Sequence, residues 1–303
     1  MSDPRGAALP VAGAEPGPEL RRWASSILGG APLRWRWLRP REGPTSVWIV
    51  DDEGGARAVI KAHARGRGFA QELAAHRALA GPLRRWIAPL LAASAARSAL
   101  AFAVIDGVTP EDDGDPPLHR RAGELLRALH AVPTAALGDD DPMPVEAAIE
   151  RRWQGALDAA APRLGRDRCA RLAGSVRPGI FRGLTRVIAH RDFAPDNWIV
   201  ATDGELRVID FEQCRADLAL VDRVILAGGP WRRRPALRAA FDAGYGAPLD
   251  DLGRERLAML RILDAVTTVT WARRRGVARR CADAEALLAA LERDPHAAVD
   301  AGA

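Results

Sequence analysis

The sequence predicts an α/β chain of the α+β type with two lobes: a small antiparallel-sheet N-lobe and a mostly helical C-lobe. Three observations favour this fold class. Short alternating segments lie between residues 33 and 105, long segments with helical spacing follow residue 107, and a strand-like block at 187–213 interrupts them. The 303 residues suffice for two domains, because most domains contain about 100–200 residues.

The N-lobe is expected to span residues 20–105, after a flexible tail at 1–19 that is rich in Pro, Gly and Ala. Three alternating segments, "LRWRWLRP", "VWIVDD" and "ARAVIKA", are separated by the turn-like "REGPTS" and "EGG". They predict three short antiparallel strands. The following "FAQELAAHRALA", residues 69–80, predicts a helix that ends at Gly81-Pro82.

The C-lobe is expected to span residues 106–303, with a hinge near 103–108. The acidic, Pro-rich stretch "TPEDDGDPP" marks the change from short alternating segments to long segments with helical spacing. In "LHRRAGELLRALHAV", residues 118–132, apolar side chains recur at helical spacing and predict a core-facing stripe. Two further helical regions are predicted at about 145–175 and 255–292.

Composition limits the classes of partner and compartment. The net charge is +5, and the positive excess lies in residues 20–105, whereas residues 106–303 carry −2. The arginines are not interleaved with a recognisable RNA-binding motif, so we expect no nucleic acid as partner. No apolar run reaches the roughly 18 residues of a membrane span, and the first residues lack the pattern of a secretory leader. We expect a cytoplasmic protein without a membrane partner, a monomer or weak dimer, with its three cysteines as buried free thiols.

The block at 187–213, "VIAHRDFAPDNWIVATDGELRVIDFEQ", holds the candidate chemistry. The apolar segments "WIV" and "LRVIDF" flank the turn signal "TDG" and predict a hairpin. Asp192 and Asn197 then lie in the loop before the hairpin, and Asp210 ends its second strand. Asn197 is the only asparagine of the chain, and Lys61 is its only lysine.

The motif "H-R-D-F-A-P-D-N" followed by "I-D-F-E" resembles the catalytic and metal-binding motifs of the aminoglycoside phosphotransferase family, whose fold is similar to that of protein kinases. The resemblance covers about residues 33–292, and "LLRALHAVP" at 125–133 resembles a recurrent helix end of the family. It implies that Asp192 meets the substrate hydroxyl, that Asn197 binds Mg²⁺, and that Asp210 bridges metal and phosphate. Asp217 and Asp222 resemble the family's position for an aspartate that supports the loop after D-F-E.

These residue types suit phosphoryl transfer, in which catalysis is mostly positioning and neutralisation of charge. Mg²⁺ prefers hard oxygen ligands and retains several waters, so one carboxylate, one amide oxygen and nucleotide phosphates can satisfy it. Asp192 is expected to orient the attacking hydroxyl. His190 is expected to brace the loop by hydrogen bonding.

Lys61 near the end of the third predicted strand matches the lysine that a kinase-like fold directs at the α- and β-phosphates of its nucleotide. A helix glutamate holds that ammonium, and Glu72 is the only acidic residue between positions 54 and 105. Arginine would serve poorly, because its planar fork is larger than a compact ammonium.

By the same resemblance, the loop that covers the nucleotide phosphates corresponds to "REGPTS" in this sequence. It has a single glycine, Gly43, in place of the G-x-G-x-x-G pattern of protein kinases, and Thr45, Ser46 and backbone N–H groups are the expected phosphate contacts. The sequence contains no G-x-x-x-x-G-K-[ST], which excludes a P-loop kinase by motif.

The resemblance implies a small-molecule O-phosphotransferase that uses ATP or GTP with Mg²⁺, with a nucleotide bound between the lobes and an antibiotic-like hydroxyl compound as acceptor. Glu212, Asp264 and Trp271 are the candidate acceptor-side residues. The weak charge of residues 106–303 gives little steering of a polycation, so a macrolide, a nucleoside or peptide antibiotic, or a metabolite such as an amino alcohol or sugar stays open.

Two alternatives are kept beside this hypothesis. A kinase of an ordinary metabolite would have the same fold, whereas a protein kinase is disfavoured because no A-P-E follows "DFE". A nucleotide-binding scaffold without turnover is disfavoured by the presence of Lys61, Asp192, Asn197 and Asp210 together.

Overall fold

The computed structural model describes residues 15–29, 33–38, 45–55, 57–64, 66–138, 143–174, 177–274 and 278–293. These residues form two compact units. The first contains the chain as far as Pro110 together with Asn197–Cys214, and the second contains Glu111–Asp196 and the chain from Arg215 onward. Residues 106–110 and 197–214, which the sequence analysis assigns to the second lobe, thus group with the first unit.

The first unit contains a five-stranded antiparallel sheet with the strand order β1-β2-β3-β5-β4. The strands are β1 (Arg34–Leu38), β2 (Ser46–Asp51), β3 (Arg57–Ala62), β4 (Leu90–Ser94) and β5 (Ala99–Ala103). The first three are the strands predicted from alternation. Strand β3 is paired on both sides, with Lys61 opposite Val47 of β2 and opposite Leu100 of β5. A central strand with two partners fixes the position of its side chains.

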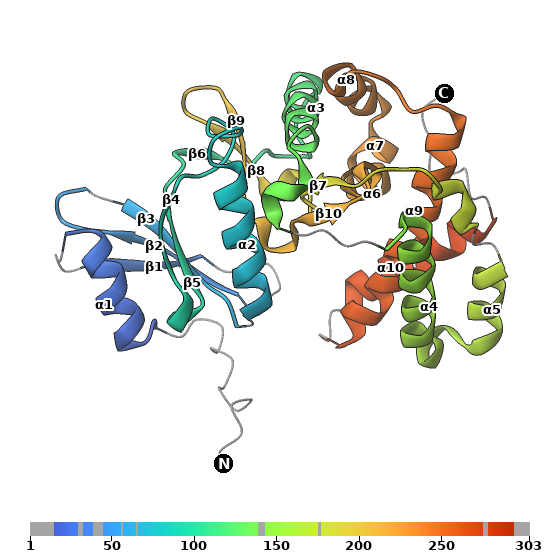
Figure 1. The fold of residues 1–303 in the computed structure, drawn as a ribbon, viewed down its shortest axis with the longest axis horizontal. Helices are drawn as coiled ribbons and strands as arrows, with labels where there is room; N and C mark the ends of the chain where they lie inside the picture. The colour runs from blue at the N-terminus through green and yellow to red at the C-terminus, as the bar shows by residue number, and fades with distance from the viewer. Residues whose placement is uncertain are drawn as a thin grey trace, which may run out of the picture. The chain divides into compact units, whose positions relative to one another are not determined.

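Two helices cover the two faces of this sheet (Figure 1). Helix α1 (Pro18–Ile27) packs Ala24 against Trp48, Ile60 and other buried side chains of one face. Helix α2 (Gly66–Leu79) packs Phe69 against Leu100 and Phe102 of the opposite face. Helix α2 matches the predicted helix and begins three residues earlier. Helix α1 was not predicted, because its few apolar residues follow a stretch without periodicity.

A small three-stranded sheet of order β6-β8-β9 completes the first unit. It consists of β6 (Gly107–Val108), β8 (Trp198–Ala201) and β9 (Leu206–Val208). The β8–β9 hairpin is the one predicted from "TDG", and Gly204 in its turn has φ +81°, a conformation that glycine adopts readily. The Val208 N–H donates to the Trp86 carbonyl at 2.8 Å, so the hairpin is tied to the segment before β4.

The second unit is mostly helical, and helices α3 (Pro116–His130) and α8 (Pro235–Tyr245) pack together in it (Figure 1). Asp115 caps α3 by accepting from the Leu118 N–H at 2.9 Å, and Pro116 follows at the first helical position. The side chains predicted to face the core are all buried: Leu118, Ala122, Leu125, Leu126 and Leu129. Gly123 and Gly244 lie at the contact, where a Cβ on Gly244 would overlap the Arg120 carbonyl oxygen.

The remaining elements of the second unit are α4 (Val145–Leu164), α5 (Arg166–Gly174), β7 (Val187–Ala189), β10 (Arg215–Asp217), α6 (Val224–Gly228), α7 (Pro230–Arg233), α9 (Asp251–Arg274) and α10 (Ala278–Arg293). Strands β7 and β10 pair antiparallel. The helical regions predicted at 145–175 and 255–292 are each two helices, broken at Gly165 and after Arg274.

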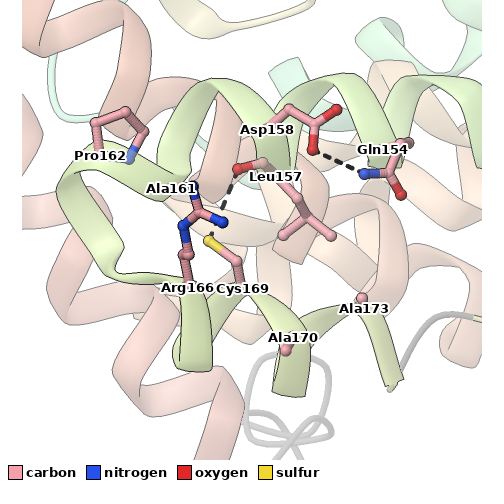
Figure 2. Close-up of a pocket in the computed structure, with 9 residues that line it drawn as sticks. All are labelled: Gln154, Leu157, Asp158, Ala161, Pro162, Arg166, Cys169, Ala170 and Ala173. Atoms are coloured by element: carbon pink, nitrogen blue, oxygen red, sulfur yellow. Dashed lines mark hydrogen bonds between the residues drawn. The ribbon is translucent and has the colours of Figure 1, made fainter.

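A cavity of about 580 Å³ opens between α4 and α5 (Figure 2). Leu157, Asp158 and Arg166 are among its lining residues, and the Cys169 thiol contacts the Leu157 carbonyl at 3.7 Å beside it. None of the residues that line it is a predicted site residue.

The three cysteines are free and buried, as predicted. In the described part of the chain, no helix combines the length and the apolar character that crossing a bilayer requires.

Candidate active site

Lys61 faces α2 because of its place in β3. Side chains alternate between the faces of a strand, and Ala58 and Ile60 pack towards α1 whereas Val59 packs with Phe69 of α2. Lys61 shares the face of Val59, and it is only 6% exposed. A buried ammonium is costly unless it is paired.

Three carboxylates of the first unit surround the Lys61 ammonium. Its Nζ lies 2.8 Å from Oε2 of Glu72, 2.7 Å from Oδ1 of Asp210 and 3.6 Å from Oε2 of Glu212. The predicted Lys61–Glu72 pair is therefore formed, and Asp210 joins it. A single ammonium with three acidic neighbours is an arrangement to which a planar guanidinium is poorly suited.

Glu72 lies on the buried stripe of α2, one turn after Phe69, and is 1% exposed. Burial alone would raise the pKa of the Glu72 carboxyl, but the Lys61 charge and the adjacent His63 side chain lower it to about 2. Burial would likewise lower the pKa of Lys61, and the charges of Glu72, Asp210 and Glu212 instead raise it above its ordinary value. Both groups are therefore charged at neutral pH.

Asn197 and Asp210 flank the same end of the β8–β9 hairpin. Trp198 pairs with Val208, and the Ile209 N–H donates to the Asn197 carbonyl at 3.0 Å, so the two backbones run side by side there. Asp210 has φ +71°, in the left-handed region, which is unusual for a residue other than glycine and recurs at functional sites.

The amide of Asn197 and the carboxylate of Asp210 suit Mg²⁺, which prefers oxygen donors. The Asp210 side chain is 35% exposed, so water and phosphate oxygens have access to it. Among the described residues no group of three or more His, Cys, Asp or Glu side chains is arranged to hold a metal. Mg²⁺ usually keeps several waters and binds substrate phosphates, which would complete the coordination of an ion held by Asn197 and Asp210.

Of the predicted phosphate-contacting residues, Thr45 is hydrogen-bonded within the Lys61 cluster. Its buried hydroxyl donates to Oε2 of Glu212 at 3.0 Å. Ser46 begins β2 with a buried side chain and pairs with Ala62, and Gly43 lies outside the described residues. Glu212, expected on the acceptor side, lies instead in the first unit beside Thr45 and Lys61, because the turn Phe211–Gln213 packs against α2.

His63 is a member of the Lys61 cluster that the sequence analysis missed. Its Nε2 lies 2.9 Å from Oε2 of Glu72, and its Nδ1 lies 3.6 Å from Oε2 of Glu212. The available signal was the period of two along a strand, which directs position 63 to the same side as Lys61.

In the second unit, the loop that carries Asp192 follows β7 and is held by Asp222. The Asp222 carboxylate accepts the backbone N–H groups of His190 and Arg191. Arg191 has φ +68°, a strained conformation for a residue with a Cβ. The Asp192 N–H donates to Nδ1 of His190 at 3.3 Å, which is the bracing contact expected of this histidine. Asp192 itself is half-buried.

Asp222 is held in turn by His130 of α3. His130 lies with Nε2 at 2.9 Å from Oδ2 of Asp222 and with Nδ1 at 2.8 Å from the hydroxyl of Tyr245, the only tyrosine of the chain. The helix end "LLRALHAVP" is thereby connected to the Asp192 loop through hydrogen bonds.

Asp217 also supports the loop, since its carboxylate lies 2.9 Å from Nε of Arg191 and 3.2 Å from Nη1 of Arg152 on α4. Burial is the main cause of a lowered Arg191 pKa, which Asp217 opposes. Asp217 and Asp222 thus have structural contacts with the loop that carries Asp192, whereas the resemblance implies support of the loop after D-F-E.

Asp264 and Trp271 both lie on α9 in the second unit. Asp264 is accessible to solvent, yet the surrounding protein, together with the negative charge of Asp192, raises its pKa to about 6 against the opposing effect of Arg261. Trp271 is half-buried and packs against the cluster of Val269, Ala272 and Cys281.

Solved structures with a similar fold include a macrolide phosphotransferase, an aminoglycoside phosphotransferase and an ethanolamine kinase. The macrolide 2'-phosphotransferase MphH from Brachybacterium faecium has a TM-score of 0.62 at 17% identity, over 88% of this chain and 97% of that chain. The GDP and kanamycin complex of APH(2")-IIIa has a TM-score of 0.66 at 16% identity, over 89% and 97%. An ethanolamine kinase from Plasmodium vivax has a TM-score of 0.61 at 13% identity, over 85% and 81%. At these identities the likeness demonstrates the predicted kinase-like fold.

No curated protein sequence matches the chain. The model of one family, described as the phosphotransferase enzyme family (APH), matches residues 38–260, a range that contains Lys61, Glu72, Asp192, Asn197 and Asp210. On this match over most of its length, the chain belongs to the phosphotransferase enzyme family.

Proposed function

We propose that this protein transfers the γ-phosphoryl group of ATP or GTP to a hydroxyl group of an antibiotic-like small molecule. The observation that carries the proposal is the Lys61 ammonium, 2.8 Å from Glu72 and 2.7 Å from Asp210. A buried lysine between a helix glutamate and a metal-binding aspartate is the arrangement used in kinases to hold nucleotide phosphates.

In this proposal the first unit binds the nucleotide. Lys61 contacts the phosphates, Glu72 fixes the ammonium, and Asn197 and Asp210 would hold Mg²⁺. When bound, Mg²⁺ neutralises charge that develops on the phosphoryl oxygens. Thr45 and Ser46 are the proposed additional phosphate contacts.

The second unit supplies Asp192, which receives the acceptor hydroxyl. Its half-buried carboxylate can accept a hydrogen bond from that hydroxyl and orient the oxygen for attack. The backbone contacts to Asp222 restrict the loop, so that this carboxylate has a defined position before substrate arrives. Asp264 is the proposed contact for a donor group of the acceptor, since its carboxylate is exposed on α9.

The experiment that tests the proposal supplies γ-labelled ATP or GTP with Mg²⁺ to panels of aminoglycosides, macrolides, nucleoside and peptide antibiotics, amino alcohols and sugars. A product that has gained one phosphoryl group, identified by mass, supports the proposal. Absence of both product and nucleotide binding would contradict it and favour a different role for the Lys61 cluster.

Asp192→Asn separates catalysis from nucleotide binding. We expect turnover to fall by about 10²- to 10⁴-fold, the range for loss of a group that assists proton transfer, while nucleotide affinity is retained. Asp167→Asn on the exposed surface of α5 is the control and should leave turnover unchanged. Full turnover by Asp192→Asn would remove Asp192 from the mechanism.

A kinase of an ordinary metabolite is the second candidate. It is favoured by the similarity to an ethanolamine kinase, with a TM-score close to those of the antibiotic kinases, and by the small charge of residues 106–303. The same screen distinguishes the two, because the amino alcohols and sugars are assayed beside the antibiotics.

A further inference from the structure

His63 is a buried histidine that the proposed function does not use. It lies between the carboxylates of Glu72 and Glu212. It directly follows β3, and its backbone N–H donates to the Ser98 carbonyl at 2.9 Å, which continues the β3–β5 pairing. Its side chain is 2% exposed, with Nε2 at 2.9 Å from Oε2 of Glu72 and Nδ1 at 3.6 Å from Oε2 of Glu212.

The ring has a fixed place. It lies edge-to-face against Phe69, with ring centroids 6.3 Å apart. Gly68 leaves room for it, since a Cβ at position 68 would lie 3.1 Å from Nδ1 of His63, closer than ordinary contact. The place after β3, the contact with Phe69 and the space left by Gly68 therefore keep the two ring nitrogens facing the carboxylates.

The short contact with Glu72 is an electrostatic one rather than an aligned hydrogen bond. A carboxylate has only acceptor oxygens, so Nε2 is the N–H side of this contact. Oε2 of Glu72 lies 2.8 Å from the Lys61 ammonium and 2.9 Å from Nε2 of His63, and at 1% exposure Glu72 has almost no contact with water. Loss of the imidazole would leave this buried carboxylate oxygen with the Lys61 ammonium as its remaining close contact, and with space to rotate away from it.

We propose that His63 is a positioning residue of the nucleotide site: it holds the Glu72 carboxylate in the orientation that directs the Lys61 ammonium at the nucleotide. The inference rests on the proposed function, because it assumes that Lys61 binds nucleotide phosphates. The Nδ1 contact with Glu212 contributes less to this role, since the distance of 3.6 Å exceeds hydrogen-bonding distance.

Two isosteric variants separate the ring nitrogens. The amide nitrogen of Gln can take the place of Nε2, and that of Asn can take the place of Nδ1, so His63→Gln keeps a donor for Glu72 and His63→Asn does not. We expect His63→Asn to raise the Kd for Mg-nucleotide, and its KM, by about tenfold, because the Glu72 carboxylate loses its short contact with Nε2. His63→Gln should stay within about threefold of the wild-type protein.

A double-mutant cycle tests whether His63 acts through Glu72. Glu72→Gln should weaken nucleotide binding, and His63→Asn should add little in that background. The control is His119→Gln in the second unit, where another fully buried histidine bonds to Asp113 and Trp231. It should lower thermal stability without changing nucleotide affinity.

The outcomes are distinct. Nucleotide binding by the wild-type protein with an unchanged Kd for His63→Asn would overturn the inference alone. A normal Kd for His63→Asn together with a raised Kd for His63→Gln would also overturn it. Additive effects of His63→Asn and Glu72→Gln on the Kd would do the same. A wild-type protein that binds no nucleotide would overturn both the proposed function and the inference.

Discussion

At the residue scale, Lys61 is the side chain with the strictest chemical requirement. Its ammonium meets carboxylate oxygens of Glu72, Asp210 and Glu212 at 2.8, 2.7 and 3.6 Å. Lys61→Arg keeps the charge but brings a larger planar group into a buried space. We expect kcat/KM for the nucleotide to fall at least about 100-fold, a loss near 2.7 kcal/mol.

Steady-state kinetics with saturating acceptor measure this loss. The matched control is Arg207→Lys, which exchanges the same two residue types in the Asp203–Arg207 pair on the hairpin and should leave kcat/KM unchanged. Near-normal activity of Lys61→Arg would show that only the charge matters.

Glu72 gives a prediction about pH and stability. Its folded-state pKa of about 2 lies below the ordinary value of 4.5. A carboxylate with a depressed pKa stabilises the fold above its unfolded pKa, and this stabilisation is lost as the pH falls through the folded value. The difference in unfolding free energy between the wild-type protein and Glu72→Gln should be about 1–3 kcal/mol at pH 7 and should shrink between pH 4.5 and 2.

Denaturant titrations at several pH values, followed by tryptophan fluorescence, test this dependence. Glu150→Gln on the exposed face of α4 is the control and should show no such pH-dependent difference. A difference that does not change with pH would mean that Glu72 stabilises by packing rather than by its charge.

Some contacts of the candidate site could be predicted from the sequence, and others could not. Lys61 and Glu72 could be paired because each is unusual for its segment in a chain that has one lysine. His63 was missed although it lies only nine positions before Glu72 and the period of two along β3 directs it to the side of Lys61. Thr45 could not be connected to Glu212, since that contact joins elements that are far apart in the chain. The Thr45–Glu212 hydrogen bond spans 167 positions, and no local pattern records such a distance.

At the element scale, the contact of α3 with α8 depends on two glycines. A Cβ on Gly244 would overlap the Arg120 carbonyl oxygen, and one on Gly123 would overlap that of Phe241. Gly244→Ala should therefore destabilise the protein by about 2–4 kcal/mol by overpacking. It should also lower activity, because His130 and Tyr245, which support Asp222, end these two helices.

Gly155→Ala is the matched control, because Gly155 lies on the exposed side of α4 with no atom within 4 Å of a Cβ built on it. Helix propensity alone then predicts a gain of about 0.5–1 kcal/mol. Thermal unfolding of both variants measures the contrast, and a stable Gly244→Ala protein would contradict the close approach of the two helices.

Long helices were predictable and short ones were not. The spacing in residues 118–132 identified α3 and its buried side chains. Helices α6, α7 and α8 were not identified, because at 5, 4 and 11 residues they are below the length at which a helix is stable by itself and depend on tertiary packing.

At the scale of the whole molecule, the residues proposed to bind the nucleotide belong to one unit built from two separate stretches of chain. Lys61 and Glu72 come from the first stretch, and Asn197 and Asp210 come from the second. A ligand that binds only the folded state at 100 times its Kd stabilises by about 2.7 kcal/mol. We expect Mg-nucleotide to raise Tm by roughly 5–10 °C for a chain of this size.

Differential scanning fluorimetry with and without a chelator measures this shift. Asp210→Asn should lose most of its Mg²⁺ dependence, while Asp203→Asn in the exposed turn of the same hairpin should keep it. A shift of equal size in Asp210→Asn would argue against Asp210 as a metal ligand.

The linear order of motifs predicted the fold class but not the composition of the units. A boundary near residue 106 follows from the change in texture of the sequence. The return of Asn197–Cys214 to the first unit does not, because it is fixed by pairing of β8 with β6 and by the contact of Val208 with Trp86.

The return of that segment has a consequence for biosynthesis. The first unit lacks Asn197–Cys214 until translation has passed residue 214, and at about 5–20 residues per second the ribosome needs roughly 5–20 s to travel there from residue 110. During that interval the nascent five-stranded sheet lacks the β8–β9 hairpin, so nucleotide binding could not yet stabilise the first unit.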